Sequence, residues 1–254
     1  MSSPDARWSA RSAELHTRVR AFMVDPGGDD FDALACAIAD HQRASEPIAR
    51  LWQHDGVTAV SRAADIPAVF TDAFRLRRIA VHPPQADVRV FRTSGTTAAT
   101  TGQHALATLA TYRCGALMHA EAMLWPDWSE SERRAFSLVA LVPRESDAPQ
   151  SSLSYMVARF ADGFGQASWH VDADMQLDAK ALVARLDALQ TPALVAGTSF
   201  AFIHLRDHLA GGSNGHALSL PVGSRLMPTG GTKGRVRAVA LLDGNADLRF
   251  VCRD

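Results

Sequence analysis

One stretch restricts the fold of this chain more than any other: the nearly continuous apolar run from Ala135 to Val142, which Pro143 closes. A strand that is apolar at almost every position has no polar face for water, so it is typical of a parallel sheet covered by helices on both sides. Further apolar runs follow at Ala167–Val171 and Pro192–Ala196, with helical patterns between them. This alternation predicts an α/β fold with a mostly parallel, helix-covered sheet.

The N-terminal part of the chain differs, because its apolar residues recur at helical spacing with no strand pattern between them. We expect helices over residues 9–24, from about Asp30, and from Glu46 to His54, with glycine-containing stretches after the first and the third. Residues 1–60 are therefore predicted to form an N-terminal helical annex. Residues 61–254 are predicted to form the main domain.

The richest cluster of hydroxyls and glycines runs from Thr93 to Gly102, after the alternating residues Val88 and Val90. A helical pattern from about Ala105 predicts the order strand, loop, helix. The unpaired N–H groups at a helix N-terminus, together with those of a glycine-rich loop, attract phosphate. The side chains that we expect around the phosphates are Ser94, Thr96, Thr97, Thr100, Thr101 and His104.

This loop is not a Walker A loop, because Gly102 is followed by Gln103 and His104 instead of by lysine and a hydroxyl residue. The alternative is a surface loop rich in serine and threonine that binds no ligand. In an α/β sheet, ligands bind beyond the carboxyl ends of the strands, and the expected strand would place the loop there.

A second informative segment runs from Pro228 to Arg235. Its adjacent glycines, Gly230 and Gly231, would let the backbone approach a flat or anionic ligand, and Lys233 supplies a positive charge beside them. A glycine-rich turn with ordinary surface cations is the alternative.

The overall composition narrows the class of protein. The chain has 254 residues, 47% of them hydrophobic, and a formal charge of −1, which argues against a nucleic-acid partner held by a basic surface. The cysteines number three and have no metal-ligand spacing, so we expect a reducing compartment and no metal site built from them. No apolar run reaches the length of a membrane span and none resembles a signal peptide, so we expect a soluble, cytoplasmic protein.

Three passages resemble the acyl-protein synthetase family of bacterial luminescence operons, the LuxE-like branch of the adenylate-forming enzymes. They are Phe91–His104, with its Thr-Ser-Gly-Thr-Thr core, the Ser-Ser-Leu-Ser-Tyr-Met segment at 151–156, and Thr229–Gly234. Their order and approximate spacing also fit, and the similarity extends from about Ile66 to Arg235. The resemblance implies the adenylate-forming type of N-terminal fold, with residues 61–254 as a partial nucleotide-binding adenylation domain and with ATP and Mg²⁺ as cofactors.

The same resemblance implies an activity and roles for individual residues. Such enzymes join ATP to a fatty acid as an acyl-adenylate and pass the acyl group to a protein thiol, so a fatty acid or other carboxylate is expected, together with an acyl-accepting reductase or carrier. The residues that would bind phosphate or nucleotide are Ser94, Gly95, Thr96, Thr97, Gly230, Gly231, Thr232 and Lys233. No residue is assigned to catalysis.

The chain also departs from the family pattern. Ala98 stands where related loops carry glycine, and Thr232 where an aromatic is common. The family's Tyr-Gly-Met-Thr-Glu segment and C-terminal lid domain are not found, so we expect either an incomplete acyl-protein synthetase or a truncated, non-catalytic relative that binds nucleotide or a partner. An unrelated hydrolase such as an esterase is a third reading, but the Gly-x-Ser-x-Gly elbow is missing.

Overall fold

The computed structural model describes residues 4–93, 101–210, 218–230 and 250–253. The chain divides into two compact units, Met1–His119 and Ala120–Asp254, and each is described by itself. The first unit contains the predicted annex, residues 1–60, and extends beyond it. The boundary predicted at residue 60 stays a prediction.

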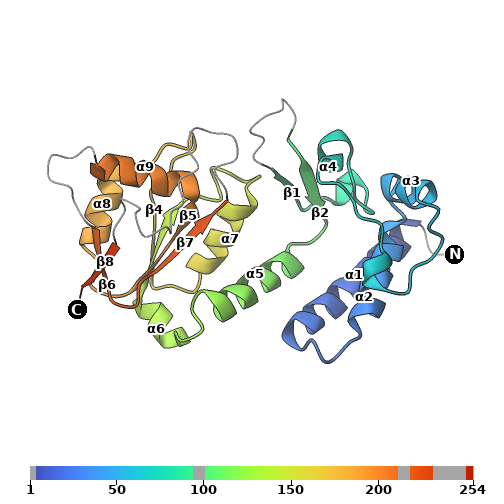
Figure 1. Ribbon diagram of the computed structural model, residues 1–254, viewed down its shortest axis with the longest axis horizontal. Coiled ribbons are helices and arrows are strands. Elements are labelled where there is room, and N and C mark those ends of the chain that lie inside the picture. The colour runs from blue at the N-terminus through green and yellow to red at the C-terminus, as the bar shows by residue number, and fades with distance from the viewer. Residues whose placement is uncertain (1–3, 94–100, 211–217, 231–249, 254) are drawn as a thin grey trace. The chain divides into compact units, whose positions relative to one another are not determined.

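Helices and strands are labelled in chain order in Figure 1. The helices are α1 (Pro4–Val24), α2 (Phe31–Gln42), α3 (Glu46–His54), α4 (Ala73–Leu76), α5 (Ala110–Met123), α6 (Glu130–Ala135), α7 (Ser152–Ala161), α8 (Ala179–Asp187) and α9 (Ser199–Ala210), with short 3-10 turns η1 (Ala63–Asp65) and η2 (Pro84–Ala86). The strands are β1 (Arg89–Arg92), β2 (Gln103–Leu106), β3 (Ser137–Leu141), β4 (Gln166–Trp169), β5 (Ala193–Thr198), β6 (Leu218–Pro221), β7 (Arg225–Thr229) and β8 (Phe250–Arg253). Among the described helices, none is both long enough and apolar enough to cross a bilayer.

The three helices expected at the start of the chain are confirmed as α1, α2 and α3. The carboxylate of Asp30 accepts a hydrogen bond of 2.7 Å from the amide of Ala33, which satisfies one free donor at the start of α2. Ile48 and Trp52 of α3 are buried, and with Ala39 of α2 they form a small core. Apolar residues of the following extended segment, including Ile66 and Val69, pack against it.

The helix expected from Ala105 is wrong, because Gln103–Leu106 is strand β2 and the next helix, α5, begins at Ala110. β2 pairs antiparallel with β1, with Phe91 opposite His104. Among the described strands these two form a sheet of their own, so the loop between them joins a β-hairpin and does not follow a strand of the parallel sheet. β2 has only four residues, Gln-His-Ala-Leu, which are too few to separate a strand from a helix start by periodicity alone.

The second unit contains the predicted parallel sheet, with strand order β4-β3-β5-β7. All residues of β3 are buried, as are the first five positions of β5, which explains their continuous apolar sequences. After α9 the chain forms two further strands, β6 and β7. Gly223, with φ +87°, lies in the turn between them.

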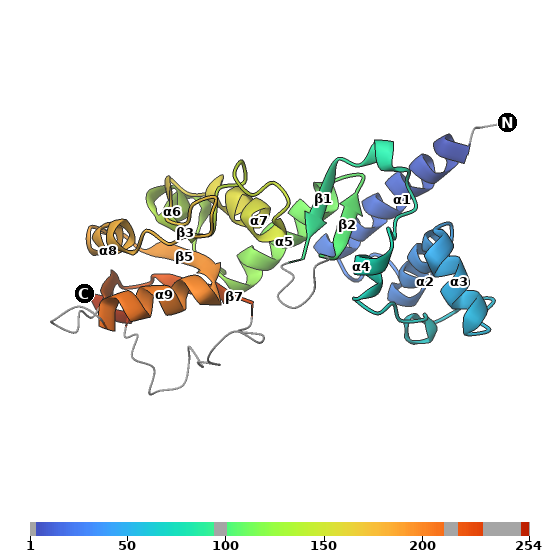
Figure 2. The same cartoon turned by 90° about the horizontal axis from the view of Figure 1, so that it is seen from above.

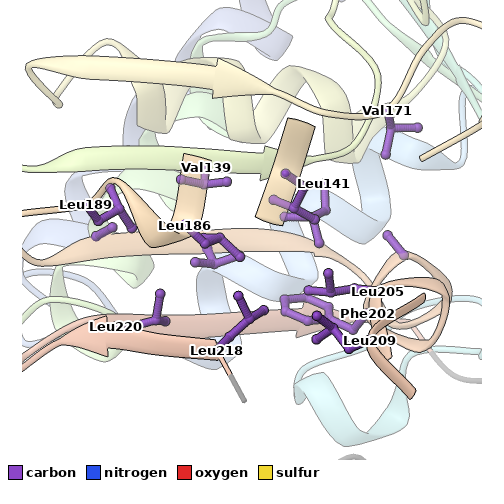
Figure 3. Packing of buried hydrophobic residues seen from close by; sticks show 14 residues of the cluster. Val139, Leu141, Val171, Leu186, Leu189, Phe202, Leu205, Leu209, Leu218 and Leu220 are labelled. Carbon is purple, nitrogen blue, oxygen red and sulfur yellow. The ribbon is translucent and has the colours of Figure 1, made fainter. Parts of the chain in front are cut away.

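Helices cover both faces of this sheet, with α7 on one face and α8 and α9 on the other (Figure 2). On the side of α8 and α9, leucines from both helices and from β6 pack against Val139, Leu141 and Val195 (Figure 3). On the side of α7, the Trp125 ring meets Phe160 edge to face, with centroids 5.3 Å apart. Because a fully buried leucine contributes about 2 kcal/mol, this double-sided core is the main source of stability in the second unit.

Candidate functional site

The two glycine-rich segments predicted to bind a nucleotide belong to different units, and each is only partly described. Ser94, Gly95, Thr96, Thr97 and Thr100 lie outside the described residues, as do Gly231, Thr232 and Lys233. The described members of the prediction are Thr101, His104 and Gly230.

The base of the hairpin loop is closed by paired hydrogen bonds between Thr93 and Gly102. The Thr93 amide donates to the Gly102 carbonyl at 2.9 Å, and the Gly102 amide donates to Thr93 Oγ1 at 2.9 Å. His104 packs its ring on Phe74, with centroids 4.5 Å apart, so it lies against an aromatic wall. The loop that carries the predicted phosphate ligands therefore starts from a fixed β-hairpin base.

In the second unit, the order of the parallel strands defines where a ligand is expected. From β3 the chain passes to β4 on one side of β3. It then crosses to β5 on the other side of β3 and continues to β7, the next strand in the sheet. The connections that leave β3 and β5 therefore diverge, and the crevice outside the carboxyl ends of such strands is the usual ligand position in an open α/β sheet. The helices α7 and α9 begin at this edge, so the partial positive charges of their N-termini lie there too.

The hydroxyl and glycine residues at the carboxyl ends of β5 and β7 hold one another in place. Thr198 pairs with Thr229 across the two strands. Ser199 Oγ donates to the carbonyl of Gly230 at 2.7 Å, and Thr229 Oγ1 donates to the carbonyl of Gly197 at 3.2 Å. The predicted residue Gly230 thus lies beside the start of α9.

Gly230 has the conformation that the sequence suggested for a glycine-rich turn. Its φ is +79°, in the left-handed region that favours glycine. A methyl group at this position would meet no atom of the described chain within 4 Å, so the backbone here is open to an approaching group.

The Ser-Ser-Leu-Ser-Tyr-Met segment forms the start of α7, with Ser151 as its N-cap. Ser151 Oγ accepts a hydrogen bond of 3.1 Å from the amide of Ser154. The Ser154 side chain is fully buried, and its Oγ has no hydrogen-bond partner among the described residues. The ring of Tyr155 is also buried, with the Arg159 guanidinium 5.3 Å from its centroid. This segment therefore fixes the helix that covers β3.

Sequence reasoning missed a cavity of about 550 Å³ beyond the carboxyl ends of β3 and β4. The Arg144 guanidinium lies 4.6 Å from the centroid of the Trp169 ring, and the indole N–H of Trp169 has no partner within the described part of the chain. His170 Nε2 lies 3.1 Å from Ser168 Oγ. Burial lowers the pKa of His170, an effect that the nearby carboxylate of Asp178 opposes.

This cavity combines an imidazole, a guanidinium and the carboxylates of Asp147, Asp172 and Asp178. Two of these carboxylates already accept backbone hydrogen bonds: Asp172 from Gln176 at 2.8 Å, and Asp178 from Ala181 at 2.9 Å. The available signal was the Trp-His pair at the end of a predicted strand, because that position lies at the ligand-binding edge of a parallel sheet.

No preformed metal site is found within residues 4–93, 101–210, 218–230 and 250–253. No group of three or more His, Cys, Asp or Glu side chains in those ranges is arranged to hold a metal ion. Comparison of the chain with protein-family models, curated proteins and solved structures finds no match.

Proposed function

We propose that this chain binds ATP and a carboxylic acid and joins them as an acyl-adenylate, in the manner of the acyl-protein synthetases that it resembles. The observation that carries the proposal is the position of Thr229 and Gly230. These residues begin one of the three resembling segments, and they lie at the carboxyl edge of a helix-covered parallel sheet. Since ligands of such sheets bind at that edge, the sequence resemblance and the fold favour the same place.

The proposed reaction needs positioning more than a strong base. A carboxylate oxygen attacks the α-phosphorus of ATP, the bond to the β-phosphate bridge breaks, and pyrophosphate leaves. Backbone N–H groups at the carboxyl edge of the parallel sheet, beside Gly230 and the start of α9, are proposed to hold the phosphates. Transfer of the acyl group to a protein thiol would then release AMP.

Mg²⁺ belongs to this proposal as a partner of the triphosphate. Such sites commonly hold Mg²⁺ through one or two carboxylates together with substrate phosphates and water, and the ion neutralises phosphate charge. The open backbone at Gly230 and the hydroxyl of Thr198, which accepts a hydrogen bond from the Ala201 amide and keeps its own proton to donate, suit a phosphate-bearing ligand.

The test compares the two lysines of the sequence, Lys180 and Lys233. We expect calorimetric titration to detect ATP binding in the presence of Mg²⁺, and decanoate to stimulate exchange of pyrophosphate into ATP. Lys233→Ala should reduce exchange about 100-fold, the usual loss for one well-placed electrostatic donor. Lys180→Ala is the control, because Lys180 is an exposed residue in the first turn of α8.

Two outcomes would change the conclusion. Absence of ATP binding at millimolar concentration contradicts the proposed function. ATP binding without acid-dependent exchange favours the non-catalytic relative, which binds nucleotide or a partner without turnover.

A further inference from the structure

A cavity of about 420 Å³ lies within the first unit. Its walls come from α1, α2, the start of α3, α4, residues 79–82, and the chain from β2 to the first turn of α5. Small-molecule sites in proteins commonly measure about 300–1,000 Å³. The cavity is therefore large enough for a ligand and is built by one compact unit.

Most of the wall is apolar. Leu15 and Ile48 are buried beside it, and partly buried apolar side chains complete it. The larger apolar residues of the lining include Leu15, Val19, Ile38, Ile48, Phe74 and Leu106. Since each methylene group moved from water into such surroundings gains about 0.8 kcal/mol, a hydrocarbon chain would bind here favourably.

Three imidazoles line the same cavity: His16 from α1, His41 from α2, and His82 from the segment before η2. His16 Nδ1 lies 2.9 Å from Thr111 Oγ1, and Arg20 Nη1 donates to the same hydroxyl at 3.1 Å. His82 Nε2 lies 2.8 Å from Asp87 Oδ1. No acidic side chain is among the described residues that line the cavity.

The surroundings of His16 and His41 lower the pKa of both rings. Burial lowers the pKa of His16, and Arg20, His41 and His82 lower it further. Burial and the positive charge of Arg11 both lower the pKa of His41, whereas the carboxylate of Asp40 raises it. An anion placed among these rings would favour their charged form.

We propose that this cavity binds an unbranched carboxylic acid, with its hydrocarbon chain among the apolar side chains and its carboxylate beside His16, His41 and His82. The choice of an acid as occupant rests on the proposed function, which requires one. It also rests on the cavity itself, where apolar walls meet a group of imidazoles and no acid among the described lining residues.

The test uses straight-chain acids from hexanoate to tetradecanoate and the whole chain, titrated without ATP. Affinity should rise about fourfold for each added methylene until the cavity is filled, and then stop rising. Decanol should bind more weakly than decanoate, because it offers no charge to the imidazoles. Decanoate binding should also take up protons, measured as a dependence of the binding heat on the ionisation heat of the buffer.

Variants separate the head group from the chain. His16→Gln and His41→Gln should each weaken decanoate about fivefold and leave decanol unchanged, whereas Val19→Phe, which fills the cavity, should weaken both. His208→Gln, at an exposed position of the second unit, is the control and should change neither. Circular dichroism of each variant establishes that it is folded.

The outcomes distinguish this proposal from the proposed function. If acid-dependent pyrophosphate exchange occurs but Val19→Phe leaves the affinity for decanoate unchanged, the cavity is not the acid site and the adenylation activity stands. If decanoate binds with the expected variant effects but ATP does not bind, the acid site stands and the adenylation activity fails. Equal affinity for decanoate and decanol would overturn the carboxylate assignment.

Discussion

Gly197 and Gly230 end neighbouring strands of the parallel sheet, yet they require glycine for different reasons. At Gly230 the reason is the backbone, whose φ of +79° strains any residue with a Cβ. At Gly197 the reason is space, because a Cβ there would lie 2.5 Å from the carbonyl oxygen of Leu141. The sequence alone shows that both are glycines near strand ends. Only the folded structure shows that backbone conformation is the reason at Gly230 and lack of space is the reason at Gly197.

We expect Gly197→Ala to destabilise the protein by about 3 kcal/mol. The added methyl would meet the backbone of buried β3, which cannot move aside as a flexible side chain would. Urea denaturation measures the change. Gly163→Ala is the matched control, since its nearest contact would be the Phe160 carbonyl oxygen at an ordinary 3.4 Å, and it should cost less than about 1 kcal/mol. Equal midpoints for the two variants would contradict this packing argument.

At the scale of elements, the start of a helix can be predicted from the sequence where a side chain that can act as an N-cap precedes it. Asp30, Ser151 and Asp178 each cap a helix through a side-chain oxygen, and the helix expected from about Asp30 begins there. The hairpin β1-β2 was missed, because its pairing joins residues on both sides of a ten-residue segment, and no local pattern reports that pairing. The buried strands β3 and β5 were predicted because burial on both faces leaves a continuous apolar run.

The candidate sites were less predictable than the elements. Glycine and hydroxyl clusters mark possible phosphate loops; Gly230 has a φ of +79°, and phosphate binding at these clusters stays a prediction. The two cavities were not predicted, because His16, His41 and His82 come from separate segments that meet only in the folded unit. Helical spacing indicates that a residue faces inward, but it does not identify the residues that face it from other elements.

Ser151→Ala tests how much the N-cap hydrogen bond of Ser151 stabilises α7. Loss of the hydrogen bond from the Ser154 amide should lower the free energy of unfolding by about 1 kcal/mol, the usual cost of removing a serine N-cap. Ser146→Ala is the control, because the exposed Ser146 hydroxyl donates to Asp147 and caps no helix. Urea denaturation of both variants measures the difference. A similar loss for the control would show that the effect is not a capping effect.

For the whole molecule, partly buried histidines in both units link stability to pH. His16, His41 and His170 each have a pKa lowered chiefly by burial from the ordinary value of 6.5. In the window below 6.5 the unfolded chain therefore binds more protons than the folded chain, so stability rises with pH there and falls as the pH is lowered.

We expect the melting temperature to fall as the pH is lowered from about 7.5 to 5.5, where the unfolded histidines take up protons. The slope for each histidine should stay well below the limit of about 1.4 kcal/mol per pH unit, because these rings are only partly buried and solvent screens them. Thermal unfolding of His170→Gln should give a flatter pH profile than the unsubstituted chain. Ser168→Ala is the matched control, since it removes the hydroxyl 3.1 Å from His170 Nε2 but keeps the imidazole, and it should retain the steeper profile. Identical profiles for His170→Gln and the unsubstituted chain would show that burial of this ring does not couple folding to pH.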